Sequence, residues 1–317
     1  MENMLNCFKD FKCIKGACKK SCCTLWQIEV DKKTLKKYKK VKGEFKSRIE
    51  GGINFHTSSL CVNKGRCAFL NSDNLCDIII NLGEEYLSEV CAIHPRFINK
   101  FKNYTEMGVG ISCEEGARLL LSFNGEIKPS APPSVKKLKG FEKDIFLFRE
   151  KVLSILYNGA SLKNRIVNIL ELLSINENDF LSLPFTKILS SMEILDSSWK
   201  DKLSLFSSLS YPVEEEDKFT NLLAYFIYRH LITALDNLDL KSKTLFALFS
   251  SLAIHNIYMN GKKREVNFSL LEIARDYSGE IEYSKENLYR LFDFFEEFII
   301  KQDIKPTTTK AVFDRNF

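Results

Sequence analysis

The chain has 317 residues, of which 45% are hydrophobic and 27% are charged. This composition is typical of a packed globular protein and excludes a disordered or fibrous one. The 46 basic and 41 acidic residues give a formal charge of +5, which is too small to indicate a nucleic-acid partner. The length is enough for one large domain or two ordinary ones.

The sequence gives no sign of export or of a membrane span. Residues 1–10 carry charge and lack the long apolar core and the cleavage site of a secretory signal. The most apolar windows, 222–235 and 245–259, contain charged or imidazole side chains and are shorter than the roughly 20 residues that cross a bilayer. We therefore expect a cytoplasmic protein without a transmembrane span.

All ten cysteines lie in the first 113 residues. Thiols stay reduced in the cytoplasm, so a dense cysteine set in a chain without an export signal favours metal or cluster binding over disulfides. Iron–sulfur clusters and zinc ions both take thiolate ligands, so the number of thiols does not decide between them. Structural zinc sites usually show paired C-x2-C knuckles, and their absence here favours a cluster.

A run of seven lysines lies between residues 32 and 42, directly after the first cysteines. Such a run usually forms a solvated helix face, and this is the interpretation that we favour. The alternative is a surface that approaches anionic lipid or an acidic partner, which leaves peripheral membrane association open.

A proline-rich run at residues 127–135 predicts an extended connector, because proline disfavours helix on either side. We therefore expect a cysteine-rich, cluster-binding and catalytic domain at 1–126, a linker at 127–135, a helical domain at 136–304 and a flexible tail at 305–317. The expected fold class is mainly α, with a metal- or cluster-stabilised N-terminal domain followed by an α-helical bundle.

Apolar residues recur at three- and four-residue spacing after the linker. In 142–158 they place Ile145, Phe148, Val152 and Ile155 on one helix face. Similar stretches cover the ranges 162–173, 219–236, 242–259 and 284–300, the last of which begins at a capping serine, Ser284. The pattern predicts a bundle with an aromatic core, in which His230 and His255 are structural.

Three residues near the later cysteines carry a charge or an imidazole. His94 lies three residues after Cys91 and either completes a mixed thiolate and imidazole site or lies in a turn stopped by Pro95, which we favour. Arg96 and Arg118 are candidates to neutralise a thiolate-bound centre or an anionic cofactor group, and ordinary surface ion pairs are the alternative.

Four ordered blocks give the sequence a more specific character. They are C-I-K-G-A-C-K-K-S-C-C-T-L-W-Q-I-E-V-D, G-R-C-A-F-L-N-S-D-N-L-C, L-G-E-E-Y-L-S-E-V-C-A-I-H-P-R-F and I-S-C-E-E-G-A-R-L-L-L. Together they resemble the flagellin lysine-N-methylase (FliB) family, within the wider group of bacterial proteins with a CxxxCC-type cysteine cluster. The resemblance covers roughly residues 11 to 122 and is followed by weaker helical similarity.

The resemblance implies an activity and a set of ligands. The activity is transfer of a methyl group from S-adenosylmethionine to ε-amino groups of flagellin lysines, with a [4Fe-4S] cluster held by the cysteine-rich motif. The family cysteines correspond here to Cys13, Cys18, Cys22, Cys23, Cys67, Cys76, Cys91 and Cys113, whereas Cys7 and Cys61 lie outside the shared pattern. Eight thiols are more than one four-iron cluster needs.

Methyl transfer to lysine requires a neutral amine, although an exposed lysine with a pKa near 10.4 is protonated at neutral pH. The site must therefore desolvate the amine or supply a base. Glu114 and Glu115, directly after Cys113, are the candidate bases. Acidic residues also favour the first turn of a helix, so the two residues equally suit a helix start.

Two functions of other classes compete with the methylase. In a non-enzymatic binding module a zinc ion or cluster would only stabilise the fold, and S-adenosylmethionine would not bind. In an electron carrier a cluster would be reduced reversibly without any methyl acceptor.

Overall fold

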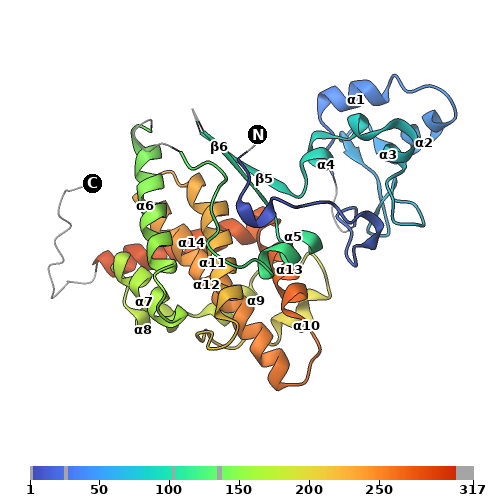
Figure 1. The fold of residues 1–317 in the computed structure, drawn as a ribbon. Helices are drawn as coiled ribbons and strands as arrows, with labels where there is room; N and C mark the ends of the chain where they lie inside the picture. Colours follow the sequence, from blue (N-terminus) through green and yellow to red (C-terminus); the bar gives the residue numbers. More distant parts are fainter. Residues whose placement is uncertain (1–2, 25–27, 102–103, 134–137, 305–317) are drawn as a thin grey trace.

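The computed structural model describes residues 3–24, 28–101, 104–133 and 138–304. Within these ranges the protein is mainly α, as expected (Figure 1). The helices are α1 (Lys32–Tyr38), α2 (Phe45–Gly52), α3 (Asp77–Leu82), α4 (Glu89–Ile93), α5 (Glu114–Leu121), α6 (Phe141–Leu156), α7 (Leu162–Leu172), α8 (Glu177–Leu181), α9 (Phe185–Ser190), α10 (Trp199–Leu203), α11 (Glu216–His230), α12 (Asn237–Lys263), α13 (Leu270–Ile281) and α14 (Lys285–Ile304). The predicted tail at 305–317 lies outside the described residues.

The strands in the described ranges are short and pair as antiparallel hairpins. β1 (Ile53–Asn54) pairs with β2 (Ser59–Leu60), β3 (Val62–Asn63) with β4 (Arg66–Cys67), and β5 (Arg96–Lys100) with β6 (Thr105–Val109). Only the last hairpin extends over five residues in each strand.

The long helices of the second half confirm the predicted periodicity. α6, α7, α11, α12 and α14 cover the five predicted stretches, and the backbone N–H of Asn287 donates to Ser284 Oγ at 3.0 Å, as a capping serine requires. The predicted helical stretches do not include α13, although Ser269 and Glu272 form a capping box at its start. The S-x-x-E pattern was therefore the available signal for this helix.

The larger of the two apolar cores fills the helical body. Tyr225, Phe226 and Tyr228 of α11 are buried in it, as are Phe246 and Phe249 of α12, which confirms the prediction of an aromatic core. The same core also includes residues from the first third of the chain: Leu5, Phe8, Val109, Ile111, Ala117 and Leu120. The N-terminal segment, β6 and α5 thus pack as part of the helical body.

A second apolar core lies in a small lobe formed by residues 28–91, which contains α1 to α4 and lies to one side of the helical body in Figure 1. Its buried members include Val30, Tyr38, Ile49 and Phe69. The residues of the smaller core all precede residue 92, whereas the larger core takes residues from both sides of the proline-rich run at 127–135 that we predicted as the linker.

The described part of that run, residues 127–133, contains no helix and packs against other parts of the chain. Ile127 is buried in the larger core, and the backbone N–H of Asn6 donates to the carbonyl of Lys128 at 2.9 Å. Leu5 forms an isolated bridge with Pro129. The run is therefore packed against the N-terminal segment.

The hairpin of β5 and β6 is tied to the helical body by a buried ion pair. Arg149 of α6 contacts both carboxylate oxygens of Glu106 in β6, and both side chains are fully buried. The guanidinium also lies over the rings of Phe146 and Tyr228, with its carbon 4.7 Å and 4.6 Å from the two ring centroids. This pair fixes the hairpin that leads into Cys113.

Candidate metal-binding site

Four thiols meet where the loop of residues 13–22 passes the start of α5. Cys13, Cys18 and Cys22 belong to this loop, and Cys113 is the N-cap residue of α5. Burial raises the pKa of the Cys18 thiol to about 12, with further contributions from charge on Cys113 and Cys13. The pKa of Cys22 is raised by a hydrogen bond with the next thiol in the chain, by burial, and by charge on Cys13 and Cys113. We call these four residues the outer thiol group.

Hydrogen bonds and ion pairs hold the loop of the outer thiol group against α5 and the helical body. The backbone N–H of Lys19 donates to Glu114 Oε2 at 2.8 Å, and Arg275 Nη1 of α13 lies 3.5 Å from the same oxygen. Lys20 Nζ lies 2.6 Å from a carboxylate oxygen of Asp196. The three residues between Cys18 and Cys22 are thus held through contacts with Glu114 of α5 and with Asp196.

Asp276 of α13 forms ion pairs with three cationic side chains at this junction. Its carboxylate lies 3.1 Å from Lys20 Nζ, 3.0 Å from Lys202 Nζ and 2.9 Å from Arg275 Nε. Burial alone would raise the pKa of Asp276, but the hydrogen bond from Arg275 and the neighbouring cations lower it below its usual value. Asp276 is therefore ionised and holds the cysteine loop against α13. The sequence did not indicate a role for Asp276, because no local pattern relates residue 20 to residue 276.

A second set of thiols lies in the small lobe. Cys67 is buried in the lobe's apolar core, and Cys23, Cys76 and Cys91 pack against that core. Burial raises the pKa of Cys67 to about 12 and that of Cys91 to about 11, and charges on the other members of the set contribute to both shifts. We call Cys23, Cys67, Cys76 and Cys91 the inner thiol group.

The two groups meet at one pair of adjacent residues. A hydrogen bond from the Cys22 thiol lowers the pKa of Cys23 to about 7, against the effect of burial, and Ser21 and Arg66 lower it further. The thiols of Cys22 and Cys23 therefore connect the outer group to the inner group.

Cys7 and Cys61 are the two cysteines that we do not assign to either group. Cys7 is buried in the larger core, and the carbonyl of Cys61 accepts a hydrogen bond from Ala68 N–H at 2.8 Å.

The residues that the structure describes contain no set of three Cys, His, Asp or Glu side chains already placed as metal ligands. The thiols of each group are neighbours without being at ligand spacing. Their chemistry nevertheless fits a thiolate-bound centre, because each group offers four sulfur donors and soft donors suit iron and zinc. Binding of such a centre would draw the four sulfur atoms of a group together.

Close to each thiol group there is also a buried hydroxyl that has no hydrogen-bond partner. Ser112 Oγ precedes Cys113 of the outer group, and Tyr38 Oη lies beside Cys67, Cys76 and Cys91 of the inner group. A buried hydroxyl without a partner costs free energy, so both positions favour a further acceptor in the functional protein.

The two candidate bases form the first turn of α5, which begins at Glu114. Glu114 accepts a hydrogen bond from Lys19 N–H of the cysteine loop, as described above. Glu115 accepts two hydrogen bonds at 2.7 Å from Arg118, and this pair lowers the pKa of the Glu115 carboxyl. The geometry gives both residues and Arg118 positioning contacts, while a role in proton transfer or cofactor binding stays a prediction.

Arg96 and His94 lie at the entry to β5. The Arg96 guanidinium carbon lies 5.2 Å from the ring centroid of Phe11. His94 and Pro95 form a turn after α4, which confirms the turn that the sequence favours, and the peptide bond between them is cis. Burial, with the charge of Arg229, lowers the pKa of His94 to about 4.

His230 and His255 have hydrogen-bond partners in the helical core, as predicted for structural histidines. His230 Nε2 lies 2.7 Å from Glu282 Oε1, and His255 Nδ1 lies 2.9 Å from the carbonyl oxygen of Ser210. Glu282 also pairs with Arg229 at 3.0 Å.

The seven lysines of the basic run lie on and after α1. Most of them are exposed, so this surface is a solvated helix face as expected. Lys37 is the exception, because its ammonium contacts the carbonyl of Glu85 at 2.5 Å and lies over the Tyr86 ring.

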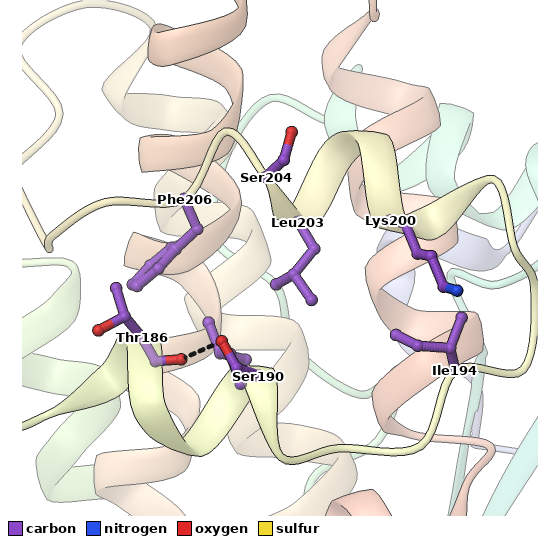
Figure 2. Close-up of a pocket in the computed structure, with 8 residues that line it drawn as sticks. Thr186, Ser190, Ile194, Lys200, Leu203, Ser204 and Phe206 are labelled. Carbon is purple, nitrogen blue, oxygen red and sulfur yellow. Dashed lines mark hydrogen bonds between the residues drawn. The ribbon is translucent and has the colours of Figure 1, made fainter.

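A pocket of about 430 Å³ lies between α9 and α10, away from the named candidates (Figure 2). Leu203 and Phe206 give it an apolar wall and Lys200 a single cation. The hydrogen bond drawn in Figure 2 runs from Ser190 Oγ to the carbonyl of Thr186 at 2.7 Å, within α9. No sequence-predicted site residue lines this pocket, and we assign it no function.

Fold and site together define a helix-rich protein whose small lobe and cysteine loop carry two groups of four thiols. Over 121 residues, or 35% of its length, the chain is 30% identical to the flagellar biosynthetic protein FliU of Salmonella muenchen, 72% of which is covered. It is also 30% identical over 121 residues to the lysine-N-methylases of Salmonella typhimurium and Salmonella choleraesuis. The chain therefore belongs to the family of FliU and lysine-N-methylase (FliB).

The match spans only 30% of the length of each lysine-N-methylase. No protein-family model matches the chain, and no solved structure matches it. Among the helices of the described residues, none is both long enough and apolar enough to cross a membrane.

Proposed function

We propose that the chain transfers methyl groups from S-adenosylmethionine to ε-amino groups of lysines on flagellin, with a [4Fe-4S] cluster held by the outer thiol group. The observation that carries the proposal is the relationship to proteins named lysine-N-methylase and FliU. The placement of Cys13, Cys18, Cys22 and Cys113 beside one another supports it.

The outer group suits the cluster better than the inner one because it is more accessible. Cys13 and Cys22 are exposed, whereas the inner group packs against an apolar core. A protein substrate and a small cofactor must both reach the reacting atoms. A cluster held by Cys13, Cys18, Cys22 and Cys113 would supply iron for binding the amino and carboxylate groups of S-adenosylmethionine, or would supply an electron.

The chain's own residues hold the loop and manage the proton. Glu114 fixes Cys18 and Cys113 in one place, because it accepts from Lys19 N–H and begins the helix that Cys113 caps. The target lysine must lose a proton before its nitrogen attacks the methyl carbon. We assign this proton to Glu114, whose carboxylate lies beside the thiols, and not to Glu115, whose pKa is lowered by Arg118.

The test is the intact mass of flagellin co-expressed with the wild-type chain or its variants. Methylation should appear as mass steps of one methyl group with the wild type, and should be absent with Cys18→Ser and Cys113→Ser. Cys61→Ser, a thiol outside both groups, is the matched control and should methylate normally. Unmodified flagellin with the wild-type chain, produced with iron and without oxygen, would contradict the proposal.

A second measurement separates the two roles of Glu114. Glu114→Gln keeps an oxygen that accepts from Lys19 N–H but cannot take a proton. If Glu114 is the base, the variant loses about 100-fold or more in rate and the rise of rate with pH changes. A variant that keeps the wild-type rate and pH profile would leave Glu114 a positioning residue only.

A further inference from the structure

Residues 32–46 of the small lobe hold eight lysines and one acidic residue, Glu44. Helix α1 and the turn after it carry most of these lysines, and Figure 1 shows α1 at the outer edge of the lobe. The proposed methyl transfer makes no use of this charge. We define the basic face of α1 by its exposed lysines, which are Lys32, Lys33, Lys36, Lys39, Lys40 and Lys42.

The contacts of α1 with the lobe turn these lysines toward solvent. One carboxylate oxygen of Asp31 accepts from Thr34 N–H at 2.9 Å and caps the helix, and the other accepts from Glu89 N–H of α4 at 2.9 Å. Thr34 and Tyr38, four residues apart, are buried, and Leu35 packs against the core of the lobe. The lysines therefore occupy the opposite side of the helix.

The basic face has almost no counter-charge of its own. Among the described residues, no carboxylate lies within ion-pair distance of the following lysines: Lys32, Lys33, Lys36, Lys40 and Lys42. Lys32 and Lys36 lie four residues apart on α1, a spacing at which like charges repel and destabilise a helix. A polyanion bound to this face would offset the repulsion.

The composition of the face favours an acidic protein over a lipid bilayer or a nucleic acid. A helix that lies on a bilayer needs exposed apolar side chains, and none of the large exposed apolar side chains of the described residues lies within 32–46. Nucleic-acid surfaces use arginine for bidentate phosphate contacts and aromatic rings for base stacking. Every basic residue of 32–46 is a lysine, and the rings of Tyr38 and Phe45 pack in the core of the lobe.

We infer that the basic face of α1 is an electrostatic docking surface for an acidic segment of the protein substrate. Lysine ammonium groups are strongly hydrated point charges on flexible stems, so they suit fast capture through interchangeable contacts. Charges of this kind act mainly on the association rate and on its dependence on salt. The identity of the partner rests on the proposed function, whereas the carboxylates expected on its surface follow from α1 alone.

The experiment measures the association rate of flagellin with the full-length chain, without S-adenosylmethionine. In the test variant Lys32→Gln, Lys33→Gln and Lys36→Gln are combined. We expect this variant to associate about tenfold more slowly than the wild type at low salt. The difference should disappear at about 1 M salt, where the Debye length is about 3 Å.

The matched control removes the same charge from exposed positions of the helical body. It combines Lys143→Gln, Lys187→Gln and Lys263→Gln, which lie on α6, α9 and α12. The control should keep the wild-type association rate, because its lysines lie outside the basic face. Equal rates for the test and control variants would overturn the inference.

Steady-state kinetics separate docking from an effect on the reaction or on folding. The test variant should raise the KM for flagellin by about tenfold and keep kcat, because the docking contacts are the same in the ground state and the transition state. A short lysine peptide without acidic residues should be methylated equally by both chains. Arginine at the three positions keeps the charge and should keep the wild-type KM. A fall in kcat with an unchanged KM, or a raised KM in the arginine variant, would contradict docking by charge.

Other polyanions test the assignment to a protein. A poly-glutamate peptide should compete with flagellin for the wild-type chain. Vesicles that contain phosphatidylserine, or duplex DNA, should bind the test and control variants equally. Binding of either that is lost only in the test variant, with unchanged flagellin association, would overturn the inference. Flagellin that docks through α1 but stays unmethylated would contradict the proposed function alone, whereas normal methylation with equal association rates would contradict the docking surface alone.

Discussion

Replacement of Asp276 by asparagine tests how the cysteine loop is held. The substitution keeps the size of the side chain and removes the charge that faces Lys20, Lys202 and Arg275. Asp276, Lys202 and Arg275 are nearly fully buried, with side chains 3%, 7% and 5% exposed. Two buried cations then lose their shared counter-charge, which is more damaging than loss of a surface ion pair.

The expected magnitude follows from this burial. Breaking a buried pair by removing one partner costs about 3–5 kcal/mol. The contact with Lys20 adds little, because Lys20 is partly exposed and retains Asp196. We therefore expect Asp276→Asn to lower the free energy of unfolding by about 3 kcal/mol, or the melting temperature by about 5 °C for a chain of this length.

The assay is denaturant unfolding at pH 7, with hydrogen exchange of the loop as a local readout. Amide exchange of residues 18–22 should become faster in Asp276→Asn, because the loop loses the ion pair between Lys20 and Asp276. Asp201→Asn is the matched control, since Asp201 lies on the exposed face of the adjoining helix α10 and should change stability by less than about 0.5 kcal/mol.

The pH dependence supplies a second check. Because the folded pKa of Asp276 is lowered, its stabilising effect is complete above the unfolded pKa of about 3.9 and is lost as the pH falls through the lower folded pKa. The stability gap between wild type and Asp276→Asn should therefore narrow below about pH 4. A variant as stable as the Asp201→Asn control at pH 7, with unchanged exchange in the loop, would refute the reasoning.

Three further predictions concern the body that supports the site. Arg149→Met leaves the buried carboxylate of Glu106 without its cationic partner, and should cost about 3–5 kcal/mol in urea unfolding. Gly110→Ala places a Cβ 2.5 Å from the Tyr283 hydroxyl, and calorimetry should show a loss of about 1–3 kcal/mol. Burial lowers the pKa of His255 to about 4, so the neutral ring stabilises the fold above the unfolded pKa of about 6.5, and this is lost as the pH falls to 4. His255→Gln should flatten the fall in stability between pH 6.5 and pH 4, and an unchanged slope would contradict the assignment.

The sequence predicted the helices of the body well because their periodicity is local. Ile145, Val152 and Ile155 repeat on one face of α6 whatever that face contacts, and a capping serine marks the start of α14. It predicted the extent of the cores less well. Val109 and Ile111 pack with the helical body although they precede the proline-rich run. The ladder of β5 and β6 and the Arg149–Glu106 ion pair hold this segment against the body.

By itself, the sequence determined that the second half is helical and that all ten cysteines lie in the first 113 residues, since side-chain spacing and residue type are properties of the chain alone. Only the tertiary structure divided the eight thiols into an outer and an inner group, which the adjacent Cys22 and Cys23 connect. It also brought Asp276 to Lys20 and the Tyr38 hydroxyl to the inner thiols. These contacts join residues far apart in sequence, and their energies depend on burial and charge that exist only once the chain has folded.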